Sequence, residues 1–261
     1  MTLVKAMTVR RSAHLVIVFA SLCLASATAG RAAAMTSQGA LGDVLFGEQA
    51  PDDRRAPPPP VARYVSDEGE SFVLDRTSPT PLLKFEESQE VFVLSPSPAA
   101  RGDTIYRDDV GDPVLRATKL GGLTLFYRGR PGGAPVAFAG QGAAIHLQAL
   151  SPGALGQRLL QASVKASHAA KRLIVFDAQE VTSGSEAVFA DAAAVAAEAV
   201  VMIAHRKDGR SLLSRFGRVL FVPGARCDAS VSHGVMNITI NPSQGLAGRP
   251  SSTRIVAAAA R

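Results

Sequence analysis

The only cysteine beyond residue 34 is Cys227, and its thiolate could act as a nucleophile if a histidine lay beside it as a base. The histidines beyond residue 34 are His146, His168, His205 and His233, of which His233 is nearest in sequence. Nothing in the sequence fixes their geometry, so we favour an exposed loop thiol that is open to oxidation or to an intermolecular disulfide. G-x-S-x-G and S-x-x-K are absent from the same residues, which speaks against the commonest serine hydrolases. Catalytic residues are therefore unknown from the sequence.

Arg249 lies in a closing segment, residues 243–252 (SQGLAGRPSS), whose glycines and serines could bind an anion through backbone N–H groups. The segment lacks the Gly-Lys-Ser/Thr ending of a phosphate-binding loop. We favour a structured C-terminal loop that docks on the domain, with Arg249 paired to a carboxylate or to backbone carbonyls. Anion binding at Arg249 is the alternative. Residues 256–261 (VAAAAR) are expected to fray.

Carboxylates that could bind a metal ion occur in two places. Asp191, Glu198 and His205 are spaced seven apart, which on a helix separates neighbours by about 10.5 Å and is too far for a shared zinc ion. We interpret them as a solvated or polar-bridging edge. The three aspartates of residues 107–113 (RDDVGDP) lack the spacing of a calcium loop and are typical of a turn. Residues 101–103 (RGD) match an adhesion tripeptide by chance, and we expect no metal and no cofactor.

The long alanine-rich segment at residues 183–209 is the element most clearly predicted, and it is a helix. Ser183 and Glu186 fit a capping box at its start, and Gly209 would end it after three basic side chains. Its apolar residues predict a mostly buried scaffold helix. Two acids near the middle argue against a membrane span.

Residues 1–34 have a basic start, an apolar run and small residues at the cleavage positions, as a secretory signal peptide does. Cleavage after Ala29 and after Ala34 both fit, with Ala29 slightly preferred because it lies closer to the apolar run. The general secretory route is favoured over the twin-arginine route. The mature protein is expected in the periplasm or secreted. Residues 35–60 end in PDDRRAPPPP and predict an extended proline-rich linker.

The formal net charge of +6 comes largely from this leader, because residues 35–261 hold 24 basic against 22 acidic side chains. Residues 35–150 have an excess of four acidic side chains, and residues 151–261 an excess of six basic ones. The basic residues are scattered and lack interleaved aromatics, so nucleic acid is not an expected partner.

Two regions are predicted after the linker, and together they give an α+β protein. Residues 61–140 contain short β-prone runs between turns, which favour an antiparallel sheet, a sandwich or a small barrel. Residues 90–94 (EVFVL) are apolar on both faces and predict a central strand. Residues 150–256 alternate α-β-α-β-β, with two helices covering a sheet and the last two strands forming a hairpin. Parallel strands around the long helix would imply a right-handed crossover.

Two segments, RGDTIYRDDVGDPVLRATKLGGLTLF at residues 101–126 and INPSQGLAGRPSSTRI at residues 240–255, carry a resemblance to a known family. With the leader and the proline linker, the chain resembles a family of uncharacterised exported bacterial proteins, catalogued as a domain of unknown function. The resemblance spans about residues 45–255. It implies an exported protein and brings no activity, cofactor or catalytic residue.

The sequence favours a non-catalytic binding or structural role in the bacterial cell envelope. Its expected partner is an envelope protein or ligand that the sequence does not identify, and no stable membrane span is expected after signal removal. The alternative is a secreted hydrolase with an unrecognised active site. The two hypotheses differ in whether a histidine, a carboxylate and Cys227 or a serine converge in one pocket.

Overall fold

Short strands separated by tight turns build the first region, as the alternating β-prone runs predict. The computed structural model describes residues 59–126 and 132–261, so the expected leader and nearly all of the expected linker lie outside the described residues. Within the described part of residues 61–141, the strands are β1 (Val61–Ser66), β2 (Ser71–Asp75), β3 (Leu82–Phe85), β4 (Val91–Val93), β5 (Ser95–Pro98), β6 (Thr104–Arg107), β7 (Pro113–Ala117), β8 (Leu123–Leu125) and β9 (Ala134–Gln141). One short 3-10 turn, η1 (Ala100–Gly102), connects β5 to β6. We call residues 61–141 the β region.

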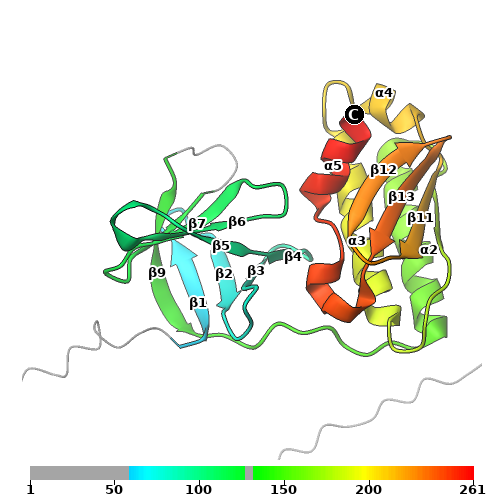
Figure 1. Ribbon diagram of the computed structural model, residues 1–261. Helices are drawn as coiled ribbons and strands as arrows, with labels where there is room; N and C mark the ends of the chain where they lie inside the picture. The colour runs from blue at the N-terminus through cyan, green and yellow to red at the C-terminus, as the bar shows by residue number, and fades with distance from the viewer. Residues whose placement is uncertain (1–58, 127–131) are drawn as a thin grey trace, which may run out of the picture. The chain divides into compact units, whose positions relative to one another are not determined.

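The β region is a single antiparallel meander whose ends approach each other. Its strand order is β4-β3-β2-β1-β9-β8-β7-β6-β5, so β1 pairs with β9 and most other strands pair with their neighbours in sequence. The outermost strands, β4 and β5, are separated in the chain only by Leu94, so the sheet curves until it is nearly barrel-shaped (Figure 1). Its core consists of buried apolar residues: Ala62, Tyr64, Phe72, Leu74, Leu83, Leu94, Leu115, Leu123 and Leu125.

The prediction of a central strand at residues 90–94 is wrong. The strand β4 lies at one end of the strand order and pairs with β3 alone. Val91 is nevertheless buried, and the 3-10 segment near the C-terminus contacts this strand. The apolar character on both faces therefore reflects cover from a distant part of the chain and not a second neighbouring strand.

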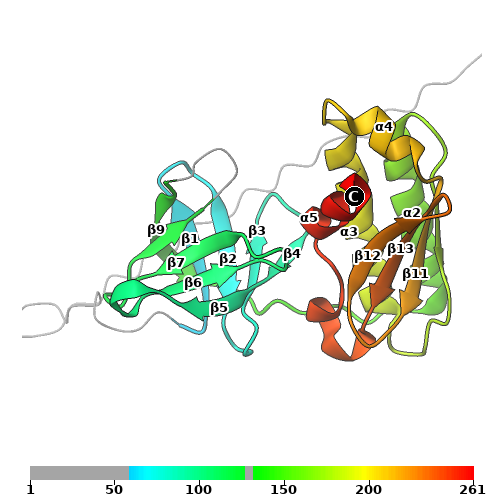
Figure 2. The same cartoon turned by 45° about the horizontal axis from the view of Figure 1, so that its top comes forward.

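The second region alternates helices and strands, and the predicted α+β class is confirmed. Its elements are α2 (Pro152–Ala170), β10 (Val175–Ala178), α3 (Glu186–Ala204), α4 (Gly209–Ser214), β11 (Arg218–Pro223), β12 (Asp228–Ser232), β13 (Val235–Ile240), η2 (Pro242–Gly248) and α5 (Ser252–Ala260). Helices α2 and α3 lie on one face of the four-stranded sheet (Figures 1 and 2). Alternate residues of β11 and β13, such as Phe221 and Ile238, are buried beneath them. We call residues 152–260 the α/β region.

The expected hairpin of the last two predicted strands is wrong. The sheet order is β10-β11-β13-β12, and β11 runs parallel to both β10 and β13. The segment expected to be a loop after Cys227 contains β12, which forms the hairpin with β13. His233 and Gly234 both have positive φ at its turn, of 50° and 77°. β12 contains few apolar residues, so it lacks the clear apolar–polar alternation by which a strand is recognised in a sequence.

The predicted long helix is confirmed in its interior and corrected at both ends. The N-cap of α3 is Ser185, and Glu186 accepts a hydrogen bond at 2.7 Å from the backbone N–H of Gly184. Ser183 therefore forms no capping box with Glu186. The helix ends at Ala204, and Gly209 begins α4 instead of terminating α3. By length and hydropathy α3 resembles a membrane span, but 61% of that window is buried inside the protein.

The C-terminal residues form a helix, so the expectation that residues 256–261 fray is wrong. Ser251 caps α5 by accepting a hydrogen bond at 3.0 Å from the N–H of Arg254. The apolar side of α5 buries Ile255, Ala258 and Ala259 against the α/β core. The two serines before a run of good helix formers were the sequence signal for this helix.

Candidate functional site

Arg249 joins three segments that are distant in sequence. Its side chain is 1% exposed, and its Nε donates to the carboxylate of Asp191 on α3. Its Nη2 donates to the carbonyl oxygen of Val91 at 2.9 Å, and Nη1 lies 3.9 Å from Oε1 of Glu90. The predicted pairing of Arg249 with a carboxylate or with backbone carbonyls is confirmed, and both kinds of partner are present. An added anion would have to compete with these internal oxygens, and anion binding at Arg249 stays a prediction.

Glu90 and Asp109 of the β region hold the start of α5. Glu90 accepts hydrogen bonds from the N–H of Ser252 at 2.9 Å and from its hydroxyl at 2.6 Å. Asp109 accepts bonds from the N–H of Ser251 at 2.9 Å and from its hydroxyl at 2.5 Å, and Nε of Arg254 lies 3.1 Å from the same carboxylate. Carboxylates at a helix N-terminus are favoured by its exposed N–H groups and by the helix dipole. We call these contacts, with those of Arg249, the clasp.

A cavity of about 930 Å³ lies beside the clasp. Two residues of α3, Glu198 and Met202, and two of α5, Ser252 and Thr253, form part of its wall. The β region contributes the remaining lining residues, which are Glu68, Gly69, Glu70, Ser71, Phe85, Glu86, Glu87, Ser88, Glu90, Phe92, Asp108, Asp112, Pro113, Val114 and Phe126. This volume lies at the upper end of the range for small-molecule sites.

The charge of the cavity lining is strongly one-sided. Eight of the lining residues are Asp or Glu, and among the described residues that line the cavity there is no Lys or Arg. Some acids have partners outside the lining: Glu86 pairs with Arg63 at 2.7 Å, and Glu198 pairs with Lys165 at 2.5 Å. Glu70 differs, because its buried Oε2 has no hydrogen-bond partner among the described residues. The cavity therefore presents negative charge that the surrounding side chains neutralise only in part.

Three of these carboxyl groups have raised pKa values. Burial raises the pKa of Glu70, and Glu68 and Glu87 raise it further by repulsion. Burial also raises the pKa of Glu90, against the hydrogen bonds of Ser252. For Asp108, burial raises the pKa more than the N–H groups of its own turn lower it. The raised pKa values mean that the ionised form of these three carboxyl groups is disfavoured. A bound cation would favour the ionised form and would itself be stabilised by it.

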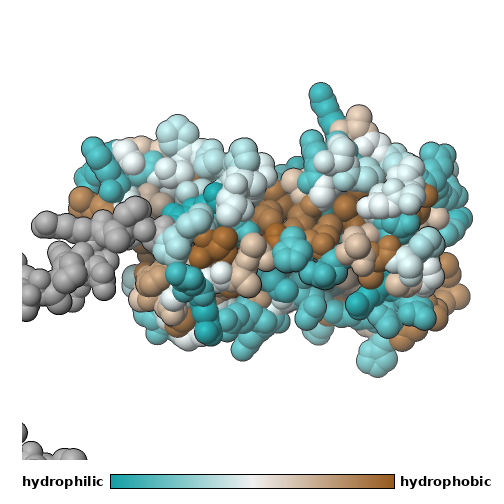
Figure 3. All heavy atoms as spheres, turned by 90° about the horizontal axis from the view of Figure 1, so that it is seen from below, coloured by the Kyte–Doolittle hydropathy of each residue, from teal (hydrophilic) through white to brown (hydrophobic). Residues whose placement is uncertain are grey.

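Apolar surface accompanies the acids. Phe85, Phe92 and Phe126 line the cavity together with Val114 and Met202. The rings of Phe85 and Phe92 meet edge to face, with centroids 5.8 Å apart. Aromatic faces attract cations through their quadrupole, so rings and carboxylates favour the same class of ligand. On the face of the molecule shown in Figure 3, hydrophobic and hydrophilic residues also lie side by side at the surface.

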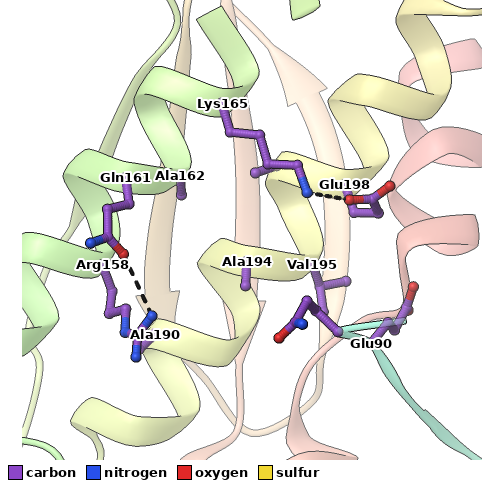
Figure 4. Close-up of a pocket in the computed structure, with 11 residues that line it drawn as sticks. Glu90, Arg158, Gln161, Ala162, Lys165, Ala190, Ala194, Val195 and Glu198 are labelled. Atoms are coloured by element: carbon purple, nitrogen blue, oxygen red, sulfur yellow. Dashed lines mark hydrogen bonds and ion pairs between the residues drawn. The ribbon is translucent and has the colours of Figure 1, made fainter. Parts of the chain in front are cut away.

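A smaller pocket of about 150 Å³ lies between α2 and α3 (Figure 4). Lys165 reaches across from α2 to Glu198, and Nη1 of Arg158 lies 3.5 Å from Oε1 of Gln161. Alanines of both helices form the floor. Glu90 and Glu198 line both pockets, so the smaller pocket adjoins the acidic cavity.

The structure does not bring Cys227 and His233 together. They flank β12, and six residue steps along a strand cover about 20 Å. Burial raises the pKa of the Cys227 thiol, which disfavours the thiolate a nucleophile needs. His146 bonds to Ala144 and Gln148, and His205 to the Val201 carbonyl. None of these contacts supplies a nucleophile with a base.

The other polar candidates have structural contacts. Asp191 and Glu198 bridge to Arg249 and Lys165, so the predicted polar-bridging edge of α3 is confirmed for these two residues. Asp108 accepts bonds from the N–H groups of Val110 and Asp112, which confirms the turn at residues 107–113. Within residues 59–126 and 132–261, no group of three or more His, Cys, Asp or Glu side chains could hold a metal ion.

Residues 101–103, the RGD match, lie in the turn before β6. Arg101 and Gly102 have positive φ values of 63° and 78°, and Asp103 pairs with Arg116 at 2.5 Å. The Arg116 guanidinium lowers the pKa of Asp103. The tripeptide is thus part of the β-region scaffold.

Sequence reasoning missed the acidic cavity. Most of its acids lie in two turns between short strands, at residues 66–70 (SDEGE) and 86–90 (EESQE). The acidic excess of residues 35–150 was the available signal, but the charge asymmetry was assessed only through the scattered basic residues. Only the closure of the meander and the position of α3 place these turns around one space.

Comparison with known proteins gives one match. The family described as a domain of unknown function (DUF4908) matches residues 40–259. Neither the curated proteins nor the solved structures contain a match to this chain.

Proposed function

We propose that this chain, which belongs to the family described as a domain of unknown function (DUF4908), is an exported, non-catalytic binding protein of the bacterial cell envelope. Its ligand is a cation with an apolar portion, bound in the acidic cavity. The observation that carries this proposal is the lining itself, where eight carboxyl groups and three phenylalanines surround about 930 Å³ without a lining Lys or Arg among the described residues.

The ligand class follows from the physical chemistry of that lining. A unit positive charge about 5 Å from a carboxylate gains roughly 3 kcal/mol at an effective dielectric constant of 20. Contacts with Phe85, Phe92 and Phe126 would bury the apolar portion of the ligand and add cation–π attraction. An anion would be repelled by the carboxylates of the lining. Polyamines and aromatic quaternary ammonium compounds represent the chemistry that fits.

The export part of the proposal rests on the leader-like residues 1–34 and on the proline-rich segment that follows. The non-catalytic part is supported by the separation of Cys227 from His233 along β12. The secreted hydrolase, the alternative at the sequence level, has no arrangement of described residues in its favour.

Isothermal titration calorimetry with spermidine and with benzyltrimethylammonium tests the proposal. We expect binding that weakens as salt is added, and at least a tenfold loss of affinity in the double variant Glu70→Gln/Glu87→Gln. Glu180→Gln, an acid outside the cavity, is the matched control and should bind as the parent does. Benzoate, an anion of similar size, should not bind. Equal affinity in the cavity variant and the control would refute the site.

A further inference from the structure

The β region and the α/β region have separate hydrophobic cores. The core of the β region contains residues between Ala62 and Val136, and that of the α/β region contains residues from Leu147 onward, with no residue in common. The clasp joins them through hydrogen bonds, which Ser251, Ser252, Arg249 and Arg254 donate to the β region. Regions with separate cores that are joined largely through polar contacts can move relative to each other.

The connection between the regions is residues 142–151, which form neither helix nor strand, and His146 is the residue between its two anchored parts. Before it, Gly142 donates to the Val61 carbonyl at 3.2 Å, and the N–H of Ile145 donates to Asp75 at 2.9 Å, so this end is anchored on the β region. After it, Leu147 packs against the core of the α/β region. His146, between these anchors, is exposed and lies in neither a helix nor a strand. A change in a few backbone dihedral angles near His146 would therefore reorient the regions.

We propose that the two regions open and close as rigid bodies about His146, and that the clasp is the latch of the closed form. The latch and the acidic cavity are physically continuous, because Glu90 and Ser252 belong to both. Opening separates the wall formed by α3 and α5 from the wall formed by the β region. That this motion admits a ligand rests on the function proposed above, whereas the motion itself does not.

Spin labels on the two regions measure this motion directly. Leu120, 97% exposed, and Leu160, 65% exposed, are replaced by Cys in a chain whose Cys23 and Cys227 are Ser. Double electron–electron resonance is recorded without any ligand. In the latch variant Glu90→Ala/Asp109→Ala we expect the share of molecules outside the main distance peak to rise at least threefold. The control Glu87→Ala/Asp112→Ala removes two cavity carboxylates that make no clasp contact, and should match the parent.

The distance distributions of the latch variant and its control decide whether the regions move about His146. A folded latch variant with the distance distribution of its control would overturn the hinge. If circular dichroism shows that this variant is unfolded, Arg254→Gln replaces it, because Arg254 is 34% exposed and contacts Asp109 from the surface. An unchanged distribution in Arg254→Gln would then overturn it too. Calorimetry with spermidine is independent of these distances, so a rigid protein that binds the probe would refute the hinge and leave the proposed function intact.

Discussion

Ser252 donates both its backbone N–H and its hydroxyl to the carboxylate of Glu90, at 2.9 and 2.6 Å, although the two residues are 162 positions apart. Both are buried, at 2% and 5% exposure. Water cannot readily replace either partner, so the loss of one leaves the polar groups of the other unsatisfied.

Replacement of Glu90 by alanine should therefore destabilise the protein by about 3 kcal/mol, because it leaves the N–H and hydroxyl of Ser252 unbonded and removes negative charge beside Arg249. Urea unfolding followed by circular dichroism measures the change. Glu87→Ala is the control, since Glu87 is exposed and should change the stability by less than about 0.5 kcal/mol. Equal effects of the two substitutions would contradict this account of the clasp.

The stability should also depend on pH through Glu90. Its folded-state pKa is raised by burial above the ordinary value of 4.5, so between these two values the folded chain binds a proton that the unfolded chain has released. This contribution to the free energy of unfolding is fully present below pH 4.5 and is lost as the pH rises through the folded pKa. Urea unfolding of the parent and of Glu90→Gln, at pH steps from 4 to 8, should show the parent losing stability relative to the variant. A constant difference would show that Glu90 does not titrate in this window.

Two glycines should respond in opposite ways to substitution by alanine. A Cβ on Gly209 would lie 2.0 Å from the carbonyl oxygen of Ile203, whereas a Cβ on Gly156 in α2 would meet nothing within 4 Å. Gly209→Ala should therefore destabilise the protein by at least about 2 kcal/mol, through overpacking against backbone. Gly156→Ala should stabilise it by up to about 1 kcal/mol, because alanine is the better helix former. Thermal unfolding of both variants checks the pair, and a harmless Gly209→Ala would show that α4 can shift.

Anion binding at Arg249 is tested with inorganic phosphate and the variant Arg249→Lys. Because the guanidinium already donates to Asp191 and Val91, we expect the parent and the folded variant to bind phosphate equally weakly. The lysine ammonium cannot reproduce the planar contacts, so the variant should be less stable by about 1 to 3 kcal/mol. Phosphate affinity that disappears only in the variant would instead support an anion site at Arg249.

The sequence predicted elements well where one local signal dominates. The alanine-rich interior of α3, the alternation of helices and strands in the α/β region and the short strands of the β region were all found because propensity and periodicity agree there. The start of α3 was missed because Ser185, and not Ser183, occupies the N-cap position and its side chain makes no capping hydrogen bond there. Strand β12 was missed because its exposed polar residues do not distinguish it from a loop.

The candidate site was harder to predict, because its parts are joined only in space. The docking of Arg249 on a carboxylate and a carbonyl was predicted as a class of contact, yet neither Asp191 nor Val91 could be named. Likewise, the acids of two turns in the β region line a cavity only because α3 and α5 form its other wall. No periodicity within one element encodes such a relationship.

The closed meander of the β region also determines where new chain ends could be placed in a circular permutant. Ala62 is the register partner of Gln141, so the β region begins and ends at neighbouring points on the same strand pair. New chain ends in a described turn between two neighbouring strands would therefore leave every strand pair of the β region in place. The turn between β7 and β8, where Leu120 is almost fully exposed, is a suitable place for new chain ends in a circularly permuted β region.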